Sequence, residues 1–200
     1  MEPIQQISEL EALYGEIPEG AKRKVINHMT PLYRKWIELS RFMVLSTVGP
    51  AGTDGSPRGE DGPVVRIRDP KTILFADWRG NNRIDSLRNI VDDGRLSLMF
   101  MVGNSNNVVR INGTGFVTAD KDSRLLFAKR EILPNTVVVV HVAEVYFQCA
   151  KALMRSGLWN VDNAQVDLPT AGQFLEEQMS GFNARKYDSE YRSHAERGMW

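Results

Sequence analysis

The feature that most constrains this chain is a set of six strand-like segments separated mostly by short turns. The longest is TVVVVHVAEVYFQC, whose β-branched and aromatic residues are typical of a strand. The six segments cover residues 42–48, 64–68, 72–77, 95–102, 108–118 and 136–149. Strands with such hairpin-like spacings favour antiparallel pairing, and closure into a barrel removes vulnerable sheet edges. We therefore expect a mainly β fold, a small six-stranded antiparallel β-barrel with helices packed outside it.

Several enzyme classes are disfavoured because their motifs are missing. A dinucleotide-binding α/β fold needs regular strand–helix alternation and a Gly-x-Gly-x-x-Gly turn, and neither occurs. The chain also lacks a Walker A loop and a Gly-x-Ser-x-Gly nucleophile elbow. His28, His141 and His194 are far apart without cysteines nearby, so we expect no metal site. Cys149 ends an apolar strand, and we expect it to be buried or half-buried and unreactive.

The composition limits which kinds of binding partner can be expected. The 25 basic and 25 acidic residues balance, so bulk charge provides no basis for binding nucleic acid or an anionic membrane. A single cysteine allows no disulfide within the chain, which is typical of a cytoplasmic protein. No apolar run is long enough to span a membrane, and no signal pattern opens the chain. We therefore expect a soluble, cytoplasmic protein.

The remaining segments frame the barrel. Residues 1–40 are expected to form a helical extension packed on the barrel, with a helix that starts at Thr30-Pro31. Residues 41–149 form the barrel core, and 150–200 a helical and loop segment of the same domain. Within the core, residues 49–63 hold five glycines and three prolines, which predicts a long, functional connection. Asp120 is expected to cap a short helix.

The stretch RGNNRIDSLRNI, residues 79–90, predicts a tight turn that leads into a helix. Asn81 or Asn82 can cap that helix, and Ile84, Leu87 and Val91 would share one apolar face. Arg83 is unusual, because a cation at the positive end of a helix dipole is unfavourable unless an anion is also present. Two interpretations stay open: a phosphate site at the helix N-terminus, or a surface helix in which Asp85 balances the arginine.

Four arginines could contribute to such an anion site: Arg58, Arg66, Arg83 and Arg110. Arg66 and Arg110 fall within strands, where a charge needs a partner or solvent. Solvated strand faces explain such residues, but the set also fits a phosphate-bearing cofactor, because arginine binds phosphate through two parallel hydrogen bonds.

The order of these motifs resembles the FMN-binding core of the pyridoxamine 5′-phosphate oxidase-like family. The resemblance covers roughly residues 30–160 and includes the strands 63–68 and 72–77, RGNNRIDSLRNI, RLSLMFMV and VVRINGTGF. DGSPRG and CAKALMRSGLW are similar to a subgroup of FMN-dependent enzymes in that family. The resemblance implies a split β-barrel homodimer with FMN at the subunit interface.

It also implies roles for particular residues. Val64, Val65, Arg66 and Ile67 would line the flavin, and Ala76 and Asp77 would replace a Tyr-Thr pair near the ribityl phosphate. Asn82 and Arg83 would match an Arg-Lys pair that holds the phosphate, with Arg110 close by. Because the first residue of that basic pair is an asparagine here, Arg58, Arg66 or Arg110 would have to balance part of the charge. A family glutamine that contacts the flavin is Val108 in this chain.

The substrate side departs further. Pyridoxamine phosphate oxidases use an Arg-x-His pair near the C-terminus, whereas His194 and Arg197 have a different order and spacing. We therefore expect no vitamin B6 oxidation. Arg155 and Trp159 could reach across the dimer to a substrate, although Trp159 could equally be an interface anchor.

The resulting hypothesis is an FMN-dependent oxidoreductase whose substrate and catalytic residues the sequence does not identify. The alternatives are a non-catalytic flavin or haem carrier on the same barrel, or a deazaflavin-dependent reductase. His141 is the candidate haem ligand, but its position among valines favours a core histidine.

Overall fold

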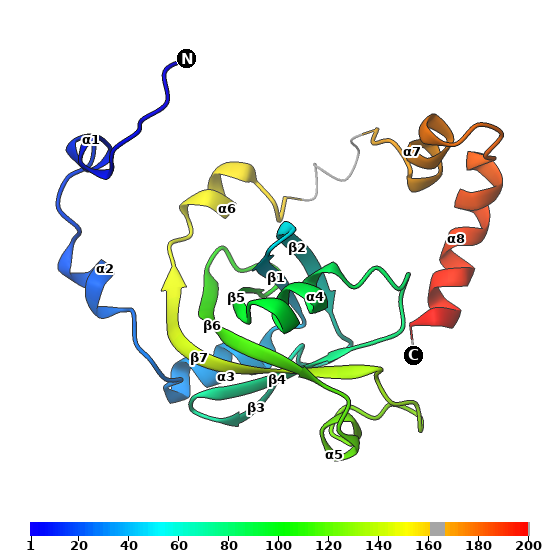
Figure 1. Cartoon of the computed structure of the whole chain (residues 1–200), viewed down its shortest axis with the longest axis horizontal. Helices are drawn as coiled ribbons and strands as arrows, with labels where there is room; N and C mark the ends of the chain where they lie inside the picture. The colour runs from blue at the N-terminus through cyan, green and yellow to red at the C-terminus, as the bar shows by residue number, and fades with distance from the viewer. Residues whose placement is uncertain (161–166, 200) are drawn as a thin grey trace.

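The protein is built around one antiparallel sheet that curls into a split barrel, seen in a computed structural model that describes residues 1–160 and 167–199 (Figure 1). The strands are β1 (Phe42–Gly49), β2 (Gly52–Gly59), β3 (Arg66–Asp69), β4 (Thr72–Asp77), β5 (Arg95–Met101), β6 (Val108–Thr118) and β7 (Thr136–Gln148). Their order across the sheet is β2-β1-β5-β6-β7-β4-β3. The predicted barrel with flanking helices is confirmed, with seven strands in the described residues where six were predicted.

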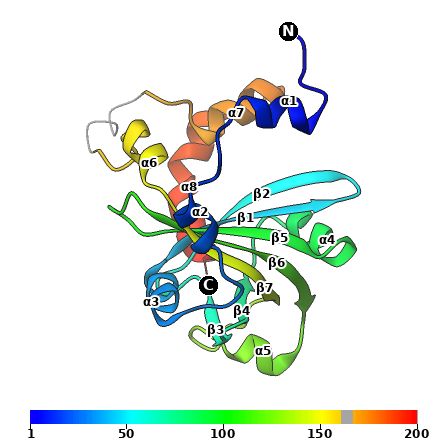
Figure 2. The ribbon, with the colours of Figure 1, turned by 90° about the vertical axis from the view of Figure 1, so that its left-hand side faces the viewer.

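The long β6–β7 pair lies near the middle of the sheet. The first half of β6 pairs with β5 and the first half of β7 pairs with β4, while β6 and β7 pair with each other along their whole length. The two halves of the sheet therefore share this ribbon and bend away from each other around it (Figure 2).

Strand alternation fills the barrel interior. In β5, Leu96, Leu98 and Phe100 are buried and the residues between them are not. β4 is buried on both faces, since Phe75 points into the main core and Leu74 packs on the opposite side with Phe127, which follows α5 (Lys121–Leu125).

The prediction of a loop at residues 49–63 is wrong, because β2 occupies most of it. β2 pairs with β1 from Gly49↔Gly52 to Phe42↔Gly59. Gly52, at φ 122°, makes the tight reversal that only glycine adopts readily. β2 is an edge strand, so Pro57 removes no bond from the sheet interior. The glycines and prolines that predicted a loop are thus accommodated at the sheet edge.

The N-terminal helices are α1 (Ile7–Ala12), α2 (Glu19–Arg23) and α3 (Pro31–Leu39). Thr30 caps α3 by accepting a hydrogen bond from the Tyr33 N–H, so the predicted helix start is confirmed. Ile37 of α3 is fully buried in the main core. α1 and α2 contain no buried residue and extend away from the barrel (Figure 1).

α4 (Asp85–Asp92) begins later than predicted and is rotated from the predicted face. Its N-cap position is Ile84, which has no side-chain acceptor, so neither asparagine caps the helix. The buried face holds Ser86, Leu87, Asn89 and Ile90, while Val91 is exposed. The Asn89 amide donates to Thr47 Oγ1 at 3.1 Å, and this bond holds α4 against β1.

The C-terminal helices are α6 (Lys151–Ser156), α7 (Ala171–Gln178) and α8 (Ala184–Gly198). α7 and α8 form a hairpin, because the Asp188 carboxylate on α8 accepts bonds from the Thr170 hydroxyl and the Gly172 N–H. Thr170 and Gln173 complete a capping box at the start of α7. No helix in the described part of the chain is long and apolar enough to cross a membrane.

The irregular pairing of β6 with β7 depends on glycine. The register shifts between Asn112 and Gly113, and a Cβ at Gly113 would lie 2.1 Å from the His141 carbonyl oxygen. A Cβ at Gly115 would likewise lie 2.8 Å from the Val139 carbonyl oxygen, so β7 closely approaches both glycines.

Gly113→Ala is therefore expected to lower the free energy of unfolding by about 1–3 kcal/mol, because β7 must move away from the new methyl group. Gly55→Ala is the matched control. Gly55 lies in the edge strand β2, and nothing lies within 4 Å of a Cβ built at that position. Urea unfolding followed by circular dichroism measures both. Equal losses in the two variants would contradict the close approach.

Candidate functional site

The candidate site lies where the two edges of the sheet meet. The edge strands β2 and β3 are consecutive in the chain, and the segment between them bonds to residues 40–41, just before β1. The Val64 N–H donates to the Ser40 carbonyl and the Glu60 N–H to the Arg41 carbonyl, both at 2.9 Å. We call the contacts of residues 58–64 with residues 40–41, 77–78 and 129 the seam. It closes the barrel without a strand pair.

An ion pair crosses the seam. Arg58 near the end of β2 donates through Nη1 to the Asp77 carboxylate at the end of β4. The side chains are only 22% and 14% exposed, so water screens this pair less than a surface pair. Arg58 Nε is buried and has no hydrogen-bond partner in the described residues. The Thr136 hydroxyl, on the residue that pairs with Asp77, is buried and unpartnered as well.

A second polar cluster fixes Trp78 beside this pair. The Trp78 indole N–H donates to Glu60 at 2.6 Å, and Lys129 Nζ donates to Glu60 and Asp61 at 2.5 Å each. The ammonium also lies 5.6 Å from the centre of the Trp78 ring. Burial lowers the pKa of Lys129, but the bonds to the two carboxylates outweigh it and raise the pKa overall. The Lys129 bond correspondingly lowers the pKa of Asp61.

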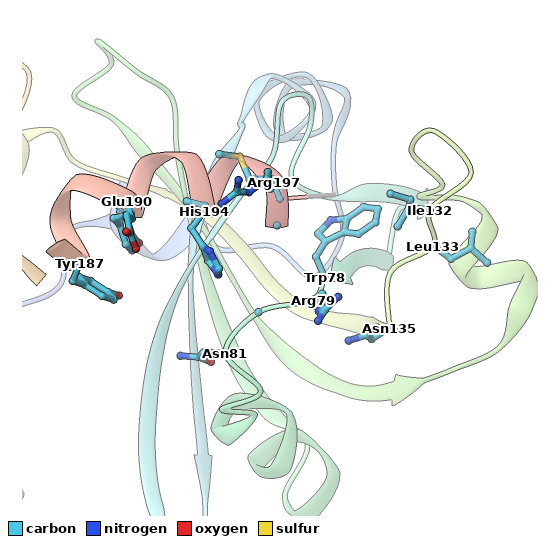
Figure 3. A pocket seen from close by; sticks show the side chains of 15 residues that line it. Trp78, Arg79, Asn81, Ile132, Leu133, Asn135, Tyr187, Glu190, His194 and Arg197 are labelled. Atoms are coloured by element: carbon cyan, nitrogen blue, oxygen red, sulfur yellow. The ribbon is translucent and has the colours of Figure 1, made fainter. Parts of the chain in front are cut away.

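Two cavities adjoin the turn at residues 78–80. The smaller, about 250 Å³, is lined by seam and strand residues that include Arg58, Val64 and Ala76. The larger, about 1080 Å³, lies between residues 78–81, the loop 132–135 and α8 (Figure 3). Trp78, Arg79 and Gly80 line both cavities, so the turn separates them.

The structure brings together four of the predicted residues. Arg58, Val64 and Ala76 line the smaller cavity, and Asp77 is joined to Arg58. The other three residues around β3 do not share one environment. Val65 is in the core, Ile67 is partly buried against it, and Arg66 is exposed with its guanidinium 5.4 Å from the Phe127 ring.

Asn82 and Arg83 lie on the exposed turn before α4. Arg83 is 80% exposed and donates to Asp85 at 2.5 Å, a bond that raises the pKa of the guanidinium. Asn81 accepts from the Arg83 N–H at 3.0 Å, which folds the turn, and Asn82 has a left-handed φ of 61°. The ion pair between Arg83 and Asp85, which the surface-helix interpretation predicts, is thus present.

Arg110 lies on the other face of the sheet from Arg58. Arg58 pairs with Met43, Met43 with Phe100, and Phe100 with Val109, so these four residues share one face of the sheet. Arg110 follows Val109 and points to the opposite face. Its guanidinium lies 5.5 Å from the Tyr146 ring and donates to Gln148 at 3.4 Å. The four arginines therefore do not converge on one point.

Two late candidates lie elsewhere. Arg155 is exposed on α6, and the Trp159 indole donates to the Ser105 carbonyl at 2.8 Å in the β5–β6 connection. The burial expected for Cys149 and His141 is wrong, because both are exposed. No group of three or more histidines, cysteines, aspartates or glutamates in residues 1–160 and 167–199 could hold a metal ion.

Sequence reasoning missed the larger cavity. The α8 residues that line it include Tyr187, Tyr191, His194 and Arg197. Figure 3 shows α8 on one side of the opening, with Trp78 and Arg79 on the other. Residues 187, 191 and 194 recur at the spacing of one helix face, so the stripe was visible in the sequence. The position of this stripe opposite Trp78 and Arg79 depends on how the α7–α8 hairpin lies, which the sequence does not show.

Comparison with known families decides the assignment. The family model described as pyridoxamine 5′-phosphate oxidase matches residues 29–149, more than half of the chain. The chain belongs to the pyridoxamine 5′-phosphate oxidase family. The match covers α3 and all seven strands of the sheet, but it ends before α6, α7 and α8. The family predicted from the sequence is thereby confirmed.

One solved structure supports the assigned fold, and others are similar at lower scores. A variant of HupZ from Group A Streptococcus is similar at 18% identity and a TM-score of 0.50, covering 60% of this chain and 98% of that one. General Stress Protein 26 from Bacillus anthracis (15% identity, TM-score 0.43, coverage 57% and 88%) and an FMN-binding protein from Syntrophomonas wolfei (14%, 0.40, 58% and 88%) are further matches. No curated protein matches the chain by sequence.

The Arg58–Asp77 pair gives a prediction for stability. Arg58→Met is expected to lower the free energy of unfolding by about 1–3 kcal/mol, because Asp77 is left poorly solvated without a partner. Arg23→Met is the matched control, since its pair with Glu19 is exposed and contributes at most about 1 kcal/mol. Urea unfolding measures both variants, and similar midpoints would show that the pair does not hold the seam.

Proposed function

We propose that this chain is an FMN-binding flavoprotein that acts as a homodimer with the flavin at the subunit interface. Membership of the pyridoxamine 5′-phosphate oxidase family supports flavin binding. The observation that carries the proposal is the turn at residues 78–83, which presents two arginines beside a large cavity at the end of β4.

The flavin phosphate is assigned to this turn. Arg83 is exposed and exchanges Asp85 for a phosphate, which carries more negative charge and more acceptor oxygens than a carboxylate. The first turn of α4 also has no side-chain cap, so its free N–H groups are open to an anion. Asn82 lies in the same turn and completes this set.

Arg79 supplies the charge that Asn82 does not. Arg58 is already balanced by Asp77, Arg66 is stacked near Phe127, and Arg110 is on the opposite face. Arg79 lies within four residues of Arg83, lines both cavities, and forms no hydrogen bond or ion pair with any described residue. It is therefore a cation of this region without a partner among the described residues, and it takes the place of the first residue of the family's basic pair.

The strands next to the turn provide the wall for the rest of the flavin. Val64 and Ala76 line the smaller cavity, and Asp77 ends β4 beside the turn. Val65, Arg66 and Ile67 are proposed to contribute through the strand backbone, because the Val65 side chain is in the core. Arg155 and Trp159 are proposed to reach across the dimer interface from α6 and the segment after it. We propose that the protein acts as an oxidoreductase, in which the bound flavin would supply hydride and electron transfer. The chain's own residues bind and orient the flavin and limit its contact with water.

The first test is the absorption spectrum after reconstitution. Purified protein is incubated with FMN, gel-filtered and measured for flavin absorption and mass by light scattering. The proposal predicts two flavins for each dimer. A colourless protein after reconstitution would refute it. A Soret band would favour a haem carrier, and preferential retention of a deazaflavin would favour the deazaflavin-dependent reductase.

The second test addresses the phosphate. Arg79→Gln and Arg83→Gln are each expected to weaken FMN by about 1.5–3 kcal/mol, or roughly 10–150-fold in Kd, through loss of a charge-assisted bond. Riboflavin, which has no phosphate, should bind both variants as it binds the wild type. Arg88→Gln is the matched control, because Arg88 is exposed on α4 outside the turn. Calorimetric titration measures each pair, and an equal loss for riboflavin and FMN would argue against a phosphate contact.

A further inference from the structure

The α8 wall of the larger cavity carries polar groups that the proposed flavin site does not use. The side chains of His194 and Arg197 make no hydrogen bond or ion pair with the residues that the structure describes, and both line the cavity. His194 projects from α8 into the opening (Figure 3), and Arg197 lines the cavity about one helical turn further along. α8 lies outside residues 29–149, so this wall is a feature of the chain beyond the family match.

Aromatic rings line the cavity from both sides. Trp78 is held from behind by Glu60 and Lys129, so its ring is fixed in place. Tyr187 and Tyr191 stand on α8, with ring centres 5.7 Å apart. A fixed Trp78 ring and aromatic side chains on α8 suit a planar ring, which gains contact area against them.

The charge of the wall suits a single negative charge. Arg197 and Glu190 are its charged groups, with His194 between them along the helix. Glu190 would repel a dianion such as a phosphate monoester more than a carboxylate. Arginine binds a carboxylate through two parallel bonds, and histidine adds a donor. Arg79 across the opening belongs to the turn assigned to the flavin phosphate.

The size of the cavity leaves room for a second molecule. Ligand cavities commonly measure about 300–1000 Å³. The space of about 1080 Å³ exceeds that range and is open to solvent along α8, and the smaller cavity of about 250 Å³ shares Trp78 with it. A flavin whose phosphate lies at residues 79–83 need not fill the part under α8.

We propose that the part of the cavity under α8 binds an aromatic carboxylate. The ring lies between Trp78 and the tyrosines of α8, and the carboxylate is bound by Arg197 with His194 beside it. This binding does not require the flavin, so it can be tested whether or not FMN binds.

The test uses naphthoate as the probe and naphthamide, the neutral molecule with the same ring, as its partner. Calorimetric titration of the full chain is expected to show naphthoate binding at least tenfold more tightly than naphthamide. Arg197→Gln should abolish that preference. Arg185→Gln is the matched control, because Arg185 is exposed on the same helix but does not line the cavity, and it should retain the preference. Thermal unfolding by circular dichroism checks that both variants fold.

FMN titrations of the same variants separate this site from the flavin site. Arg197→Gln should leave FMN affinity within about twofold, and naphthoate should not displace FMN. Equal binding of naphthoate and naphthamide would overturn the proposal, and so would equal losses in the two arginine variants. Displacement of FMN by naphthoate, with FMN weakened by Arg197→Gln, would assign the α8 wall to the flavin and overturn the proposal as well. Absence of FMN binding with anion-selective naphthoate binding would refute only the flavin proposal.

Discussion

The arrangement of this protein depends on the seam that closes its barrel. The edge strands β2 and β3 do not pair with each other, and the segment between them instead bonds through Glu60 and Val64 to residues 40–41, just before β1. Arg58, near the end of β2, forms an ion pair with Asp77. Glu60, in the segment after β2, accepts a hydrogen bond from Trp78. Because buried polar groups need partners, these contacts hold the end of β4 in a defined place. The turn at residues 78–83 starts from that end.

The position of the turn then determines the proposed chemistry. Arg58 is paired with Asp77 at the seam. The positive charge for an anion is therefore proposed to come from the arginines of the exposed turn. Trp78 separates the two cavities, and its indole and ring are held by Glu60 and Lys129. A flavin phosphate at Arg79 and Arg83 and an aromatic carboxylate at Arg197 would lie on different walls. The family core thus provides the first wall, and α8 adds the second.

How much could be predicted from sequence follows from the range of the interactions. The alternation in β5 and the Thr30 cap depend on neighbours a few residues away, so both were predictable. β2 was missed because its glycines and prolines are tolerated only at a sheet edge, and strand order is not a local property. The opposite faces of Arg58 and Arg110 depend on registers across three strand pairs. The cavity beside α8 depends on the hairpin that Asp188 holds to Gly172.

The most direct measurement is a crystal structure of the protein grown with FMN. The account predicts the phosphate within hydrogen-bonding distance of Arg79 and Arg83, with the flavin against residues 64–67 and 76–77 at the contact between two chains. It predicts that Arg58 stays paired with Asp77. A flavin whose phosphate binds away from residues 79–83, or which is enclosed by one chain between Trp78 and α8, would contradict it.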